Sequence, residues 1–281
     1  MKHLYNWGID LGGTKIECAV LDRQDPTKVI HRERIDTESV KGYDHIMAQV
    51  GRLIDSVSEK LGFRPDQIGF ATPGVLDPAS QTMKNCNTTS MNGQPMAKDL
   101  ARVVGCEVRL ANDANCFALA ETLLGAVQDV NPKAQIVFGI IMGTGVGGGL
   151  VVHGQVVNGF HGIGGEWGHN ILEDGGDPCY CGKSGCVEKV ISGPALELFY
   201  ERQTGQKKKL KEIVQAYLNH SDPAADLTVR RLMDQFGRAV STLINVIDPD
   251  VIVVGGGVGN IDLLYTEGYE CIKKYIFNSG E

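Results

Sequence analysis

Three cysteines lie close together in the stretch DPCYCGKSGCVE, residues 177 to 188. Cys179, Cys181 and Cys186 are followed two positions later by an acid, Glu188. Such a cluster can bind a metal ion, form a disulfide or remain as free thiols. A single residue separates the first two cysteines, which is not the redox C-x-x-C spacing. In a cytosolic setting, where thiols stay reduced, the cluster favours a metal site over a disulfide.

A second group of residues suited to chemistry is DLGGTK, residues 10 to 15. Glycines allow backbone N–H groups to face a bound anion, while Thr14 adds a hydroxyl and Lys15 a positive charge. Asp10 is suited to hold a magnesium ion through water. We predict a phosphate site formed by Asp10, Gly12, Gly13, Thr14 and Lys15, with a plain hairpin turn as the alternative. The Walker pattern is absent, so the stretch is not a P-loop.

Two further glycine clusters are GTGVGG, residues 143 to 148, and VVGGGVGN, residues 253 to 260. The first matches the dinucleotide pattern formally, but a strand pattern and not a helix follows it; the second has Asn260 in place of the last glycine. Nicotinamide chemistry is therefore not expected. Three glycine corners predict one nucleoside triphosphate, with its phosphates at the hairpins and adenosine at the third corner. The predicted contacts here are Gly143, Thr144, Gly145, Gly255, Gly256 and Gly257.

An internal repeat positions the first two glycine clusters. WGIDLGGTKIECAVL, starting at residue 7, aligns with FGIIMGTGVGGGLVV, starting at residue 138, at a constant offset of about 131 residues. A repeat of this length indicates a duplicated domain. Strand and helix patterns alternate, so we expect an α/β protein with a mixed sheet in each half. The expected domains are residues 1–112 and 113–281, with the ligand in a cleft between them.

Three segments show how the second half is built. The uncharged residues 134–152 could span a bilayer in length, but their glycines predict two strands joined by a turn. LTVRRLMDQFGRAVSTLINVI, from residue 227, is expected to be a long amphipathic helix. DVIVVGGG, from residue 250, is expected to be a fully buried strand.

Composition narrows the functional classes. The 281 residues carry a net charge of −7 and 42% hydrophobic residues, which is ordinary for a globular protein. The basic run QKKKLK, residues 206 to 211, is expected to be a solvated helix face, so no nucleic-acid partner is expected. No membrane span or export signal is recognised, and a cytoplasmic location is expected.

LANDANCFALAE places Asn112 and Asp113 at the start of a predicted helix. An aspartate there is commonly a helix cap. The positive helix end also favours an ionised carboxylate, which can accept a proton from an attacking hydroxyl group. The local sequence leaves both roles open.

The spacing of the glycine corners resembles that of the sugar kinase, hsp70 and actin superfamily. Within it, IIMGTGVGGGLVVHGQVVNGFHGIGGEWGHNIL resembles the signature of the ROK family of bacterial sugar kinases, and CYCGKSGCVE resembles that family's cysteine motif. NGQPMAKDL, VRLANDANCFALAE, GEWGHN and PCYCGKSGC are most similar to the fructokinase (mannofructokinase) branch, whereas NDANCFALAE and GTGVGGGL are shared with N-acetylglucosamine kinases. The resemblance implies a duplicated actin-like, ribonuclease H-like ATPase fold with two domains and a central cleft.

The activity implied by the resemblance is ATP- and Mg²⁺-dependent phosphorylation of the C6 hydroxyl of a hexose. Fructose is the expected substrate, with mannose or glucose as further possibilities and an N-acetylglucosamine or N-acetylmannosamine kinase as the alternative. A sugar-responsive repressor of the same family is a remote alternative, because Asp10 follows closely after Met1 and leaves no room for a DNA-binding segment. A homodimer is also implied.

The resemblance further implies individual roles. Asp113 corresponds to the catalytic base. The implied sugar contacts are Gly74, Asn87, Asn112, Asp113, Glu166, His169 and Glu188.

The family's cysteine motif implies a structural zinc site whose ligands are His169, Cys179, Cys181 and Cys186. Four protein ligands leave no open position, so the metal would organise the segment that carries Glu166 and Glu188 and perform no chemistry itself. Family members continue past the last glycine strand with another strand and helix, which we expect to be missing here.

Overall fold

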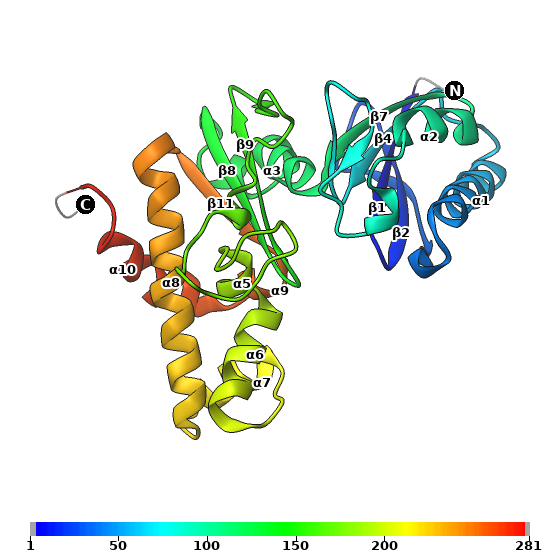
Figure 1. The fold of residues 1–281 in the computed structure, drawn as a ribbon. Helices are drawn as coiled ribbons and strands as arrows, with labels where there is room; N and C mark the ends of the chain where they lie inside the picture. Colours follow the sequence, from blue (N-terminus) through cyan, green and yellow to red (C-terminus); the bar gives the residue numbers. More distant parts are fainter. Residues whose placement is uncertain (1–3, 279–281) are drawn as a thin grey trace. The chain divides into compact units, whose positions relative to one another are not determined.

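The computed structural model describes residues 4–278 and divides the chain into two compact units (Figure 1). Unit 1 runs to Cys116 and includes Asn158–Gly164; unit 2 comprises Phe117–Val157 and the chain from Gly165 onward. The division falls inside helix α3 (Asp113–Leu124), after the border expected between residues 112 and 113.

Unit 1 is built on a five-stranded mixed sheet in the order β3-β2-β1-β4-β7. Its strands are β1 (Tyr5–Leu11), β2 (Lys15–Asp22), β3 (Val29–Asp36), β4 (Gln67–Thr72) and β7 (Glu107–Asn112). β2 is antiparallel to β1 and β3, whereas β4 is parallel to β1 and β7. Along β1, Trp7, Ile9 and Leu11 are buried and alternate with exposed or half-buried residues, as the two-residue period of a strand requires.

Helices α1 (Tyr43–Leu61) and α2 (Met96–Val104) pack on this sheet (Figure 1). Ile46, Val50, Leu53 and Val57 recur every three or four residues along α1 and are buried in the core of unit 1. The helix ends at Gly62, which adopts the left-handed conformation. Shorter elements complete the unit: β5 (Val75–Leu76), β6 (Met83–Lys84), and the 3₁₀ helices η2 (Ser39–Lys41) and η3 (Thr89–Met91).

Unit 2 repeats this plan with the sheet order β10-β9-β8-β11. Its strands are β8 (Ile136–Met142), β9 (Val146–Val152), β10 (Gln155–Val156) and β11 (Val251–Gly255). β8 is antiparallel to β9 and parallel to β11, just as β1 is antiparallel to β2 and parallel to β4. The predicted duplication is therefore confirmed, as is the pair of strands joined by a glycine turn within residues 134–152.

Helices cover both faces of the unit 2 sheet. Val137 and Val151 pack with Ala118 of α3 and Val127 of α4 (Ala126–Val130) on one face. The alternate residues, including Phe138, belong to the larger core on the other face. The remaining helices are α5 (Glu188–Ile191), α6 (Gly193–Thr204), α7 (Leu210–Leu218), α8 (Pro223–Ile247), α9 (Gly256–Gly259) and α10 (Glu267–Lys273), with the 3₁₀ helices η4 (Trp167–His169) and η5 (Asp262–Tyr265).

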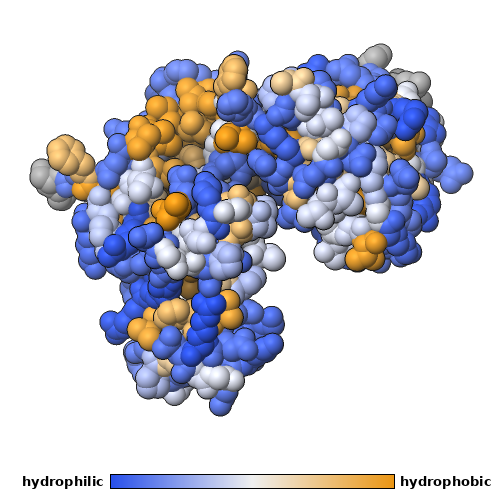
Figure 2. Space-filling model, in the orientation of Figure 1, coloured by the Kyte–Doolittle hydropathy of each residue, from blue (hydrophilic) through white to orange (hydrophobic). Residues whose placement is uncertain are grey.

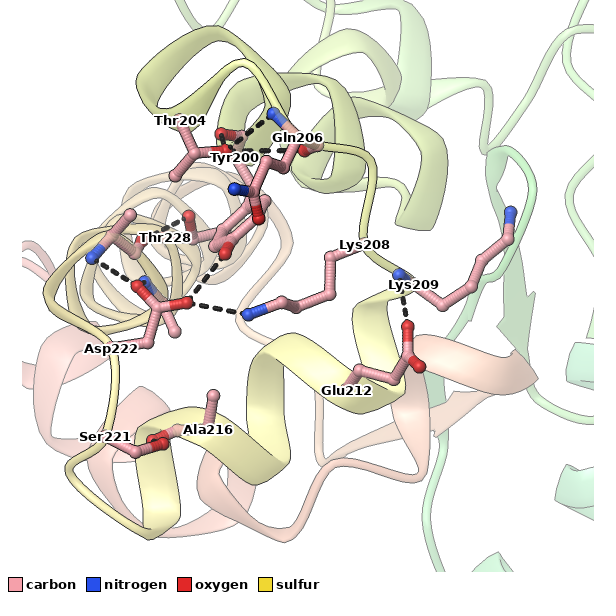
Figure 3. Close-up of polar contacts among 12 residues, drawn as sticks. Tyr200, Thr204, Gln206, Lys208, Lys209, Glu212, Ala216, Ser221, Asp222 and Thr228 are labelled. Carbon is pink, nitrogen blue, oxygen red and sulfur yellow. Dashed lines mark hydrogen bonds and ion pairs between the residues drawn. The ribbon is translucent and has the colours of Figure 1, made fainter.

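The predicted long helix is confirmed as α8, which begins earlier than expected because Asp222 caps it. The Asp222 carboxylate accepts hydrogen bonds from the N–H groups of Ala224 and Ala225, and Pro223 occupies the first turn. The Asp222 carboxylate also accepts from the Tyr200 hydroxyl and pairs with Lys208 at 2.7 Å (Figure 3). Asp222 thus connects the start of α8 to α6 and to the loop before α7.

Two expectations about unit 2 are wrong. Every residue of β11 is half-buried, not fully buried, because no strand within residues 4–278 pairs with its outer edge. Figure 2 shows apolar surface near this edge, beside one end of α8. Val246, the last but one residue of α8, is 82% exposed. The basic run is not a helix face either: it is mainly the loop before α7, with Lys208 paired to Asp222 and Lys209 to Glu197.

Between residues 4 and 278, no helix is both long and apolar enough to cross a membrane. The final strand and helix that we expected to be missing would follow residue 278, outside the described residues.

Candidate active site

In unit 1, the predicted site residues gather at one edge of the sheet. Asp10 of β1 lies opposite Ala71 of β4, and Ala71 lies opposite Ala111 of β7. The three strands run parallel, so Asp10 and the Asn112–Asp113 pair come together at their carboxyl ends. In α/β sheets this is the edge where ligands bind.

Hydrogen bonds from two side-chain hydroxyl groups fix the DLGGTK turn between β1 and β2. The Thr37 hydroxyl donates to the Gly12 carbonyl at 2.6 Å, and the Ser39 hydroxyl donates to the Gly13 carbonyl at 2.7 Å. In a trans peptide the N–H points opposite to the C=O. The N–H groups of Gly13 and Thr14 therefore point away from these two hydroxyls, as an anion-binding turn requires.

The charged residues of this turn, Lys15 and Asp10, interact with charged groups on neighbouring strands. Lys15 forms an ion pair with Asp36 at the end of β3, and both side chains are exposed. Partial desolvation and, after it, the negative charge of Glu17 raise the pKa of Asp10, while Arg34 acts in the opposite direction. Asp10 remains exposed and so is accessible to a hydrated cation.

At the start of α3, capping is done mainly by Asn112. Its side-chain oxygen accepts from the N–H of Ala114 at 2.9 Å and from that of Asn115 at 3.4 Å. Asp113 uses one carboxylate oxygen to accept from the Ala114 N–H at 2.8 Å. Desolvation and, to a smaller extent, the Asp10 charge raise the pKa of Asp113, whereas its hydrogen bond to Ala114 opposes the rise. The carboxylate is thus held in place beside a second acid.

Asn87 and Gly74 lie in loops of the same unit. Thr88, next to Asn87, lies against the DLGGTK turn, since a β-carbon on Gly13 would be 2.8 Å from the Thr88 hydroxyl oxygen. Asn87 itself is exposed. Gly74 packs so closely on Cys86 that a β-carbon would lie 2.5 Å from the sulfur, and its carbonyl accepts from the Thr72 hydroxyl at 3.1 Å. Close packing accounts for a glycine here.

Unit 2 contains a cavity of about 920 Å³ at the predicted nucleotide corners. This volume is within the usual range for small-molecule sites, about 300 to 1,000 Å³. Gly143, Thr144 and Gly257 line the cavity, and a β-carbon on Gly143 would lie 3.8 Å from the Gly257 nitrogen. The structure thus brings the second and third glycine clusters together.

The other three predicted nucleotide contacts of unit 2 have different surroundings. A β-carbon on Gly255 would lie 2.7 Å from the Phe117 ring, and one on Gly145 would lie 2.6 Å from a Glu188 oxygen. Gly256 has a φ of +83°, and a β-carbon there would overlap the Met142 carbonyl oxygen. None of the three lines the cavity. These three glycines allow the close packing around the turns that contain Gly143 and Gly257.

The opposite wall of the cavity comes from α6 and α7. Glu197 accepts hydrogen bonds from the Leu210 N–H and from Lys209, each at 3.0 Å, and so joins the two helices. The N–H of Lys209 donates in turn to Glu212, which caps α7 (Figure 3). Gln215 and Asp262 add polar groups to the lining. The cavity therefore combines an apolar floor with several hydrogen-bonding side chains.

The four predicted metal ligands come together in unit 2. The ligand atoms of His169, Cys179, Cys181 and Cys186 all lie within 4.8 Å of one another. Nδ1 of His169 is 3.5 Å from the Cys179 sulfur, and the sulfurs of Cys181 and Cys186 are 3.6 Å apart. Ligands around tetrahedral zinc are about 3.5 to 3.8 Å apart, whereas disulfide sulfurs are about 2.05 Å apart. These residues fit a zinc ion and not a disulfide.

The histidine of this cluster has a second partner. Nε2 of His169 is 3.0 Å from the hydroxyl of Tyr180, whose ring lies edge-on to the imidazole at a centroid distance of 5.1 Å. Burial lowers the pKa of His169, which favours the neutral imidazole that a metal ligand requires, while Glu188 acts in the opposite direction. Burial, then the charges of Glu188 and Glu166, raise the pKa of Tyr180. The two acids thus lie near the predicted metal ligands.

Several residues of these sites were not predicted. Tyr180 stands between two cysteines of the motif, which is a signal that could have identified it. Thr37, Ser39 and Glu197 are remote in sequence from the glycine clusters that they support, and no local pattern marks them.

Two repeated α/β units, each with a glycine turn after its first strand, define an actin-like ATPase fold, and the predicted fold class is confirmed. A model of the ROK family matches residues 6–281. The chain therefore belongs to the ROK family.

The alignments with individual relatives cover almost the whole chain. An N-acetyl-D-glucosamine kinase of Vibrio atlanticus (strain LGP32) is 36% identical over 97% of this chain and 90% of its own. The crystal structure of a ROK hexokinase from Thermus thermophilus has a TM-score of 0.82 and 30% identity, covering 96% of this chain and 88% of that one. A ROK family glucokinase from Streptomyces griseus, in complex with glucose and AMPPNP, has a TM-score of 0.80 and 25% identity, covering 98% and 91%.

These likenesses correct one expectation. The sequence motifs predicted the fructokinase branch, but the curated relative with 36% identity is an N-acetylglucosamine kinase. The motif GTGVGGGL, which the two branches share, could not separate them.

Proposed function

We propose that this chain is an ATP- and Mg²⁺-dependent kinase that phosphorylates the C6 hydroxyl of N-acetylglucosamine. The observation that carries the kinase assignment is the carboxyl edge of the unit 1 sheet, where a turn with outward N–H groups accompanies an aspartate at a helix start. The likeness to N-acetylglucosamine kinases supports the choice of sugar over fructose.

Asp113 would act as the general base. Its carboxylate is held by the Ala114 N–H, and it would accept the proton of the C6 hydroxyl as that oxygen attacks the γ-phosphate. The pKa of Asp113 is raised above the ordinary aspartate value of 3.8. This rise makes the carboxylate a better proton acceptor. Such a base contributes about 10² to 10⁴-fold to the rate.

Each unit has backbone groups that are suited to bind phosphate. The N–H groups of Gly13 and Thr14 would bind phosphate in unit 1, and the Gly143–Gly145 corner would bind phosphate in unit 2. The cavity above Gly257 would take the adenosine. Asp10 would hold Mg²⁺ through water, and that ion would neutralise charge on the transferred phosphoryl group.

We propose as sugar contacts Asn87, Asn112 and Asp113 in unit 1, and Glu166, His169 and Glu188 in unit 2. Amide and carboxylate groups suit sugar hydroxyls because each hydroxyl both donates and accepts hydrogen bonds. A zinc ion on His169 and the three cysteines would fix the segment that carries these unit 2 residues. We retain a homodimer as part of the proposal.

Product analysis tests this proposal directly. The full-length protein is incubated with ATP, Mg²⁺ and N-acetylglucosamine, and the products are examined by mass spectrometry and ³¹P NMR. The proposal predicts ADP together with N-acetylglucosamine 6-phosphate. ATP hydrolysis without a sugar phosphate, or no turnover with any hexose or acetylated amino sugar, would refute it.

A further inference from the structure

Helix α5 (Glu188–Ile191) connects the metal ligands of unit 2 with the glycine corner between β8 and β9. It begins two residues after Cys186, the last of the four predicted ligands. The chain then passes through Ser192 into α6, whose first residues line the nucleotide cavity. The helix therefore spans the distance between the two sites.

The first residue of α5 contacts the corner through its side chain. One Glu188 carboxylate oxygen accepts a hydrogen bond from the Val146 N–H at 3.1 Å. The same oxygen would lie 2.6 Å from a β-carbon on Gly145, so a side chain there would displace the carboxylate. The carboxylate thus lies directly against the backbone of the corner.

A second contact comes from the segment that carries the histidine ligand. Gly168, which precedes His169, packs so closely that a β-carbon there would overlap the Val146 carbonyl oxygen. The adjacent Trp167 donates its indole N–H to the Gly147 carbonyl at 3.2 Å. Val146 is therefore contacted on both sides by segments that flank metal ligands.

A third contact lies beyond the end of α5. The N–H of Gly193 donates to the Gly143 carbonyl at 2.9 Å, and Gly143 lines the nucleotide cavity. A corner of glycines has many accessible backbone conformations, and fixing one of them costs conformational entropy. Contacts that fix it before the ligand arrives improve binding by reducing that cost.

We propose that Glu188 is a positioning residue for the nucleotide, through which the metal-binding loop holds the Gly143–Gly145 corner in its phosphate-binding conformation. The inference rests on the proposed function, since it takes the corner to be a phosphate site. It goes further in giving the metal loop an influence on nucleotide binding, in addition to its predicted support of the sugar contacts.

The test measures the binding of ATP with Mg²⁺ by calorimetry in the absence of sugar, because Glu188 is also a predicted sugar contact. The full chain is compared in its metal-loaded form and after treatment with a zinc chelator, and exchange of the Val146 amide hydrogen is followed by NMR. Metal removal should weaken nucleotide binding about tenfold, a coupling of ordinary size between two sites, and speed exchange at Val146. Unchanged affinity and unchanged exchange after the metal has left would overturn the proposal.

Two variants of Glu188 distinguish the hydrogen bond with Val146 from the negative charge of the carboxylate. Metal-loaded Glu188→Ala should bind ATP as weakly as the chelated wild type, and chelation should weaken it little further, as expected for groups that act together. Glu188→Gln keeps an oxygen that can accept from Val146 and should lie closer to the wild type. Equal losses in the two variants would overturn the positioning role.

Glu201→Ala is the matched control, because Glu201 lies on α6 but does not line the nucleotide cavity. It should leave ATP affinity unchanged. If the metal-loaded wild type bound no ATP at all, the proposed function would fall. The exchange rate at Val146, with and without metal, would still decide whether the loop holds the corner.

Discussion

Asp10 and Asp113 lie at the carboxyl ends of β1 and β7 in one sheet, close enough for the charge of Asp10 to add to desolvation in raising the pKa of Asp113. A general base must be ionised, so kcat/KM should rise with pH through the pKa of Asp113. Replacing Asp10 by Asn removes a negative charge and should move this acid limb to lower pH, although the rate itself falls. An acid limb at the same pH in both proteins would show that another group titrates.

Asp113→Asn should lower kcat by about 10² to 10⁴-fold, because the amide cannot accept the proton. Its oxygen can still accept from the Ala114 N–H, so the fold and sugar binding should be retained. Asp129→Asn, on the exposed face of α4, is the matched control and should keep full activity. Turnover of Asp113→Asn within a few-fold of the wild type would place the base elsewhere.

Tyr180→Phe should release the predicted zinc about tenfold faster to a chelator, because the hydroxyl is the partner of His169 Nε2 and such partners fix the ring of a ligating histidine. The rate can be followed with a colorimetric zinc indicator. Tyr269→Phe provides a comparison, since that half-exposed ring contacts Lys273 and no predicted metal ligand. The same release rate for both variants would contradict the assignment to Tyr180.

Two adjacent glycines should respond differently to alanine. A β-carbon at Gly257 has open space and would project toward the cavity, so Gly257→Ala should raise KM for ATP with little change in the melting temperature. Gly256→Ala should lower the melting temperature, because φ is +83° and the methyl group would overlap Met142. Thermal unfolding with ATP kinetics measures both effects. The prediction fails if Gly257→Ala leaves KM unchanged.

Asp222 should stabilise unit 2 in a pH-dependent way. Its hydrogen bonds with Lys208 and Tyr200 lower its pKa below the ordinary value of 3.8, so its contribution is complete above that pH and is lost as the pH falls through the folded-state pKa. At neutral pH, Asp222→Ala should cost about 1 to 2 kcal/mol, since it removes a helix cap and an ion pair. Asp222→Asn keeps a cap and should cost about 0.5 to 1 kcal/mol.

Denaturant unfolding at several pH values measures these differences. The difference in the free energy of unfolding between the wild type and Asp222→Asn should become smaller as the pH falls below 3.8. A gap that stayed constant into this range would show that the charge of Asp222 contributes nothing.

The repeated strands and turns could be predicted from the sequence because glycines and alternating apolar residues act locally. The offset that matches Gly8 with Gly139 reproduces the bounds of β1 and β8. The burial of β11 could not be predicted in this way, since it depends on which strand pairs with its outer edge.

The cluster of His169, Cys179, Cys181 and Cys186 could be predicted because three of its members lie within eight positions and their chemistry is specific. The residues that support the site through long-range contacts could not be predicted. Glu188 contacts Val146, 42 positions away, and Glu197 contacts Leu210 across a loop, so only the folded chain brings these partners together.

The activity that we propose for this ROK protein is the transfer of a phosphoryl group from ATP to N-acetylglucosamine. The most direct measurement is the ratio of kcat/KM for N-acetylglucosamine to that for fructose, with ADP release followed under the same ATP and Mg²⁺ concentrations. We expect a ratio well above one, with kcat lowered about 10² to 10⁴-fold by Asp113→Asn. A ratio below one would restore the fructokinase assignment and contradict the proposed substrate.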